Sequence, residues 1–108
     1  MANFDEFINK LNQEIVEFAE YSWQNYKEFA IKDGDAFVQR AKEDLKRWTA
    51  MLANKELTRD DFEWLIVGKK DLAELVLLKQ NGLAKVALDR FVNGLIDTIV
   101  STAFKTFL

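Results

Sequence analysis

The sequence predicts an all-α protein, built as an antiparallel bundle of four long helices. Apolar residues recur at spacings of three and four along nearly the whole chain, which is the periodicity of amphipathic helices. No proline is present, so no interior helix position loses its backbone donor. The 108 residues are 49% hydrophobic and 31% charged, as in ordinary globular proteins. We therefore expect a single helical-bundle domain over residues 1–108.

The first helix is predicted over residues 5–31. An apolar stripe at helical spacing runs from Phe4 to Ala30, and the glutamates of this segment fall largely outside it. Asn3 is suited to the N-cap position, and Glu6 stands where the return partner of a capping box is found. These features place the start of the helix close to the start of the chain.

A turn is predicted at residues 33–35, where the sequence is Asp-Gly-Asp. Gly34 can adopt the left-handed conformation that ends a helix, and Asp35 can cap the next one. A second helix is then predicted over residues 36–54. Its apolar stripe consists of Val38, Ala41, Leu45, Trp48 and Leu52.

The start of the third helix carries the clearest local signal. Thr58 is a good N-cap residue, and Asp61 occupies the return position of a capping box. Leu57 and Phe62 have the spacing of a hydrophobic staple across this cap. Acidic residues in the first turn also suit the positive end of the helix dipole.

The end of the third helix is predicted near Gly82. Asn81 and Gly82 suit a C-cap, and Leu83 is placed to contact Leu78 as the hydrophobic pair of a Schellman motif. A turn at this point lets four helices fold back on one another.

An alternative without this turn remains open. No capping residue follows Gly82 before Val86, and a second Asn-Gly pair at Asn93 lies inside a strongly periodic stretch. A continuous helix over residues 59–107 would be roughly 70 Å long. A monomer of this size cannot cover such a rod, so this alternative is a three-helix chain in an intertwined dimer.

The composition argues against several kinds of chemistry. The chain has no cysteine and no histidine, so it lacks thiolate nucleophiles, the usual general base and the usual zinc ligands. Carboxylate di-metal sites in helical bundles normally include Glu-x-x-His motifs. The four glycines are far apart, and no phosphate loop or dinucleotide fingerprint is present. We therefore predict that the protein is not an enzyme and has no cofactor and no metal site.

The last segment is strongly apolar but does not have the pattern of a membrane span. A span needs about 20 mostly apolar residues. Here the longest stretch without a charge is the seven residues from Thr98 to Phe104. The N-terminus shows no signal-peptide pattern either, and a cytoplasmic location is expected. The apolar stripe of this segment serves either the core alone or the core together with an oligomer interface.

These observations favour a non-enzymatic protein–protein interaction or self-assembly module, with a second copy (a homodimer) or another protein as its partner. Tryptophan and tyrosine dominate interface hot spots, and phenylalanine covers the outer side of the predicted last helix. The candidate interaction residues are Tyr21, Trp23 and Tyr26 at the rim of the bundle, and Phe91, Phe104 and Phe107 on the last helix.

Two alternative functions are weighed against this interpretation. One is a small-molecule binder with an apolar cavity between helices, lined by the nine phenylalanines. The other is an accessory factor that binds nucleic acid through the second helix, where basic residues are interleaved with acidic ones. The net charge of −3 makes nucleic acid an unlikely partner.

Overall fold

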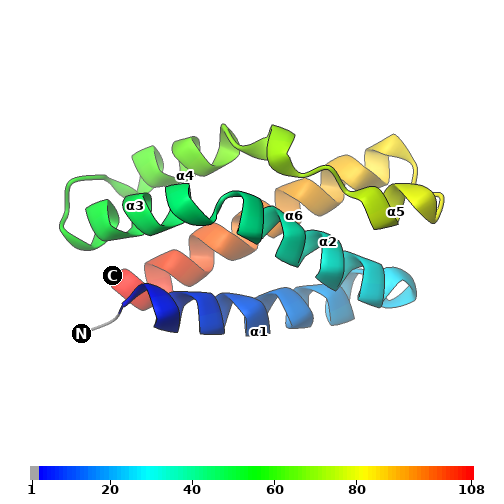
Figure 1. Cartoon of the computed structure of the whole chain (residues 1–108), viewed down its shortest axis with the longest axis horizontal. Helices are drawn as coiled ribbons and strands as arrows, with labels where there is room; N and C mark the ends of the chain where they lie inside the picture. The colour runs from blue at the N-terminus through cyan, green and yellow to red at the C-terminus, as the bar shows by residue number, and fades with distance from the viewer. Residues whose placement is uncertain (1–2) are drawn as a thin grey trace.

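The structure, a computed structural model, describes residues 3–108, and its regular elements in that range are all helical. The all-α class is therefore confirmed. In chain order, the elements are α1 (Phe4–Ser22), the 3-10 turn η1 (Gln24–Tyr26), α2 (Lys27–Arg40), α3 (Lys42–Ala53), α4 (Arg59–Val67), the 3-10 turn η2 (Lys70–Leu72), α5 (Val76–Gln80) and α6 (Lys85–Phe107). α1 runs away from the N-terminal end, α2 and α3 return, α4 and α5 run out again, and α6 returns beside α1 (Figure 1).

The helix count differs from the prediction, so a bundle of four long helices is not confirmed. Over residues 3–108 there are six α-helices. The predicted first helix is interrupted at Trp23, the predicted second at Ala41, and the predicted third after Val67. At Trp23 the backbone dihedrals are φ −135° and ψ 41°, well outside the helical region. Only the last predicted helix is continuous, as α6.

The predicted turn at residues 33–35 is wrong, because these residues lie inside α2. Gly34 is buried there, and a Cβ atom at this position would lie 3.2 Å from Ile15 Cγ2 and 3.5 Å from Leu95 Cδ1. The missing side chain thus lets α2 approach α1 and α6 closely. Tertiary packing has overridden a local turn signal.

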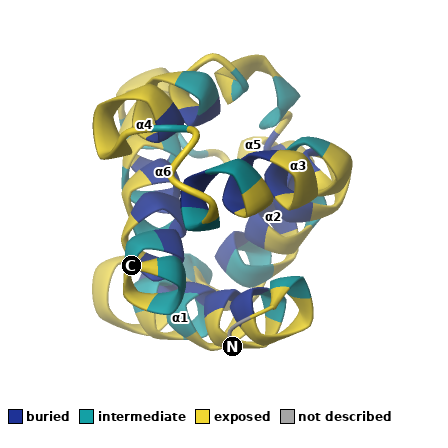
Figure 2. Ribbon diagram, turned by 90° about the vertical axis from the view of Figure 1, so that its left-hand side faces the viewer, coloured by how far each residue is buried: buried dark blue, intermediate teal, exposed yellow. Residues whose placement is uncertain are grey.

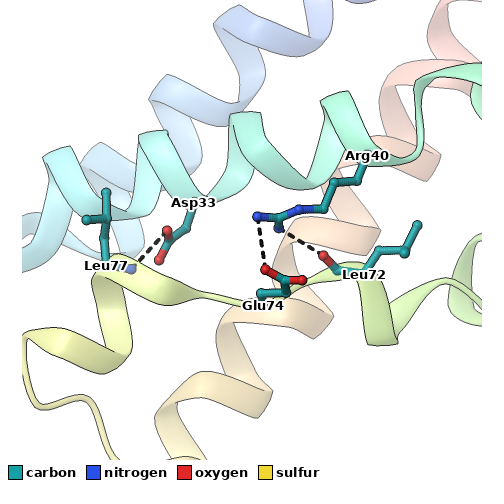
Figure 3. Close-up of polar contacts among 5 residues, drawn as sticks. All are labelled: Asp33, Arg40, Leu72, Glu74 and Leu77. Atoms are coloured by element: carbon teal, nitrogen blue, oxygen red, sulfur yellow. Dashed lines mark hydrogen bonds and ion pairs between the residues drawn. The ribbon is translucent and has the colours of Figure 1, made fainter.

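Asp33, beside it in α2, caps a different helix (Figure 3). Its carboxylate accepts hydrogen bonds from the backbone nitrogens of Leu77, at 3.2 Å, and Leu78, at 2.8 Å. These are amides of the first turn of α5, whose own N-cap residue, Leu75, makes no side-chain capping hydrogen bond. The buried carboxylate therefore has partners, and the first turn of α5 obtains its cap from across the fold.

Arg40 makes a second polar connection from α2 to the same segment (Figure 3). Its Nη1 donates to the carbonyl of Leu72 at 3.0 Å, and its Nη2 lies 3.3 Å from the Glu74 carboxylate. Together with Asp33, it holds the irregular chain between η2 and α5 against α2.

The predicted N-caps of the first and third helices are confirmed. The side chain of Asn3 accepts from the backbone nitrogen of Glu6 at 2.9 Å. Thr58 and Asp61 form a reciprocal capping box at the start of α4, with distances of 3.1 and 3.4 Å.

The predicted stop at Gly82 is also confirmed. Gly82 has φ +86° and donates to the carbonyl of Lys79, while Leu83 donates to the carbonyl of Leu78. These two hydrogen bonds form a Schellman motif. The alternative of one continuous helix over residues 59–107, and with it the three-helix chain, is therefore wrong.

The core lies between α1, α2 and α6 and continues under α3 and α4 (Figure 2). Its largest fully buried side chains are Phe7, Phe37, Phe62, Phe91, Leu11, Ile15, Leu45, Leu52, Ile66, Leu78, Leu95 and Ile99. Close packing extends to Gly94 inside α6, where a Cβ atom would lie 2.6 Å from Phe18 Cε1. Over residues 3–108, none of the helices has the length and apolar character needed to cross a membrane.

Candidate interaction surface

The candidate residues on the last helix pack mainly inwards. Phe91 is fully buried, with its ring 5.5 Å from the ring of Trp23, so its predicted place on the outer side of the helix is wrong. Phe104 and Phe107 are half-buried. The Phe104 ring lies 6.0 Å from that of Phe62, and the Phe107 ring lies 5.8 Å from that of Phe7. These three side chains contribute to the core.

The candidate aromatics near the end of α1 also occupy different environments. Trp23 is only 9% exposed and belongs to the core, which corrects its predicted place at the rim. Tyr26 is half-buried, and Tyr21 is 86% exposed. The three line a hollow of about 310 Å³ with the polar residues between them. Of the six candidates, only Tyr21 is classed as exposed.

An exposed apolar surface that the sequence analysis missed lies on α4. Trp64 is 75% exposed, and Val67 beside it is 38% exposed. Figure 2 shows that the outward side of α4 is open to solvent. The two residues border a shallow hollow of about 340 Å³ at the junction with α3. We call this area the Trp64 surface; its residues are Trp48, Trp64, Leu65, Val67, Gly68 and Lys69.

The two sides of α4 explain why these side chains face outwards. Phe62 and Ile66, four residues apart, are buried and fix which side of the helix meets the core. At 100° per residue, Trp64 and Val67 lie roughly opposite them. An aromatic residue off the apolar stripe was therefore the available sequence signal. It was not used, although the stretch was already assigned to a helix.

An ion-pair network holds one edge of the Trp64 surface in place. The Asp44 carboxylate lies 2.9 Å from Lys69 Nζ and 2.8 Å from Arg47 Nη2. Both cations also lie within 6 Å of the Trp48 ring centroid, at 5.7 and 5.8 Å. The hydrogen bond from Lys69, with the positive charges of Lys69 and Arg47, lowers the pKa of the Asp44 carboxyl below its ordinary value of 3.8. The network is therefore charged at neutral pH.

The charges along α4 are separated by sign. Asp60, Asp61 and Glu63 lie in its N-terminal half, whereas Lys69 and Lys70 follow its C-terminal end. Asp61 is engaged in the capping box, and Asp60 and Glu63 are exposed. The Trp64 surface thus has an acidic end and a basic end.

The largest of the three hollows described here lies between η2–α5 and α6 and has a volume of about 700 Å³. Its lining is mixed: Lys70, Asp71, Ala73, Leu75, Lys79, Lys85, Leu88, Asp89, Val92 and Asn93. None of the three hollows is lined by phenylalanine, so they do not supply the apolar cavity that a small-molecule binder was expected to have. Among residues 3–108, no group of three or more acidic side chains is arranged to hold a metal ion.

The basic residues of the predicted nucleic-acid surface are partly engaged within the protein. Arg40 pairs with Glu74, and Arg47 pairs with Asp44. Binding of nucleic acid through this region stays a prediction, and an ionic competitor is already present at two of its cations.

No protein-family model, curated protein or solved structure matches this chain. No relative therefore contributes a function, and the functional argument rests on the chain's own surface.

Proposed function

We propose that the protein is a non-enzymatic interaction module that binds another protein chain through the Trp64 surface. The observation that carries the proposal is the exposure of the Trp64 side chain beside an apolar hollow. Tryptophan is the residue type most enriched at interface hot spots. Removing its indole from water would contribute about 2–3 kcal/mol to association.

The surroundings of Trp64 have the layout of a small interface. The hollow beside it can accept an apolar side chain, and Gly68 has no side chain that would keep a partner's backbone away. Lys69 and the charged residues of α4 form a polar margin around this apolar centre. An apolar centre with a polar rim is the usual anatomy of protein interfaces.

A photo-crosslinking experiment tests this proposal. A photoreactive amino acid is placed at Val67, at the edge of the hollow, in cells that produce the protein. We expect a discrete protein adduct that disappears when Trp64→Ala is added. The matched control carries the same group at Glu17, an exposed position on α1 on the opposite side of the molecule (Figure 1). If irradiation yields no adduct at Val67, or the same adducts at both positions, the proposal fails.

A further inference from the structure

We infer that the chain bound by the Trp64 surface is a second copy of this protein, related by a two-fold axis that pairs the two α4 helices antiparallel. This inference rests on the proposed function and adds the identity and orientation of the partner. Three properties of the surface support it: its charges, its shape and its size.

The charge distribution of α4 is complementary to itself only in the antiparallel orientation. Asp60 and Glu63 precede or flank Trp64, and Lys69 and Lys70 follow it. In an antiparallel pair, the acidic end of each copy faces the basic end of the other. A parallel pair would place like charges opposite each other, which is unfavourable. The two helix dipoles are also opposed in the antiparallel pair, which brings each positive end near a negative one.

The shape of the surface is also complementary to itself. A two-fold interface uses the same patch on both copies, so the patch must carry both a projecting group and a place to receive it. Trp64 projects into solvent, and the hollow lies directly beside it, between Trp48 and Lys69. Each copy can therefore insert its Trp64 indole into the hollow of the other. There the indole would also meet the ammonium group of Lys69.

The size of the surface sets the expected affinity. Stable interfaces bury about 800 Å² per partner, and the six residues of the Trp64 surface provide less than that. We therefore expect a weak, concentration-dependent dimer with a Kd on the order of 10–100 µM. An interface of this strength forms and dissociates readily.

Sedimentation equilibrium of the purified full chain, from about 5 µM to about 1 mM, tests the partner's identity. The average mass is expected to rise towards twice the monomer mass over this range. Trp64→Ala should hold the protein at the monomer mass throughout. Tyr21→Ala, at an even more exposed aromatic far from α4, is the matched control and should leave the association unchanged. Circular dichroism verifies that each variant keeps its helices.

A charge-reversal experiment tests the orientation. Asp60→Lys and Lys70→Glu, each in a separate sample, place like charges opposite each other in an antiparallel dimer and should weaken it about tenfold. An equimolar mixture of the two variants restores both opposite-charge pairs and should restore dimerisation. The double variant should also dimerise, for the same reason. Neither residue takes part in the Asp44 network, so the hollow itself is left intact.

The outcomes separate this inference from the proposed function. A protein that stays monomeric at all concentrations, but still forms an adduct with a different protein at Val67, overturns the second-copy inference and leaves the proposed function standing. A monomer with no adduct overturns both. A dimer that Trp64→Ala abolishes, but that the charge mixture does not restore, overturns the antiparallel arrangement.

Discussion

The carboxylate of Asp33 accepts a 2.8 Å hydrogen bond from the backbone nitrogen of Leu78, a residue 45 positions further along the chain. Helix capping usually involves side chains next to the helix start. Here a side chain inside one helix caps another helix, so the start of α5 depends on its docking against α2. The contact therefore couples local helix formation to tertiary structure.

Replacing Asp33 should destabilise both the fold and the start of α5. Asp33→Ala leaves the amides of Leu77 and Leu78 without their acceptor, which should cost about 1–3 kcal/mol in urea denaturation. Hydrogen exchange at these two amides should become faster than at the rest of the core. Asp35→Ala, an exposed aspartate in the same helix, should change stability by less than about 0.5 kcal/mol. Equal effects of the two substitutions would contradict the capping role.

A methyl group at Gly94 should destabilise the contact between α1 and α6. Alanine favours a helix by about 1 kcal/mol over glycine. The new Cβ atom would nevertheless lie 2.6 Å from Phe18 Cε1, so the half-buried ring must move. We expect Gly94→Ala to lower the free energy of unfolding by about 1–2 kcal/mol, and Phe18→Leu in the same chain to recover part of the loss. A rise in Tm for Gly94→Ala alone would contradict the close approach.

Lys55 offers a position at which stability can be gained. It follows α3 with φ 62°, and Glu56 after it donates to the carbonyl of Met51, so the helix ends in a Schellman motif without glycine. Lys55→Gly should stabilise the protein by about 0.5–1 kcal/mol, measured by thermal unfolding, because glycine adopts this conformation without a steric cost. Lys55→Ala keeps the left-handed strain and should bring no such gain.

The Asp44 network should contribute stability that depends on pH. Because the folded-state pKa is lowered, the contribution is complete above the unfolded-state value of about 3.8 and is lost as the pH falls through the lower folded-state pKa. Asp44→Asn should therefore cost about 0.5–1 kcal/mol at neutral pH and almost nothing in strong acid. Glu43→Gln, an exposed neighbour in the same first turn, is the control for the helix dipole. A cost that is constant with pH would exclude the ionic explanation.

Truncation of aromatic residues should separate the surface from the core. Trp64→Ala removes a side chain exposed to solvent in the monomer, so it should change the free energy of unfolding by less than about 0.5 kcal/mol at dilute concentrations. Phe91→Ala removes a fully buried ring and should cost about 3–5 kcal/mol. Chemical denaturation of both variants measures the difference. A large loss for Trp64→Ala would show that this residue is structural.

Features controlled by neighbouring residues were predictable from the sequence. The all-α class follows from apolar spacing, and the capping box of Thr58 with Asp61 and the stop at Gly82 are confirmed. In each cap, the donor and acceptor lie within five residues of each other. The residue types alone therefore carry the information.

The candidate surface and several helix boundaries depended on contacts between distant residues. Gly34 looked like a turn, but its nearest contacts are Ile15 and Leu95, on two other helices. Phe91 was assigned to the outside and is buried by the packing of α1 against α6. Trp64 was left unassigned, since periodicity marks a side of a helix but does not show what covers it. The sequence by itself determined the helices and their local caps, and only the tertiary structure decided which sides are covered, because burial depends on partners far away in the chain.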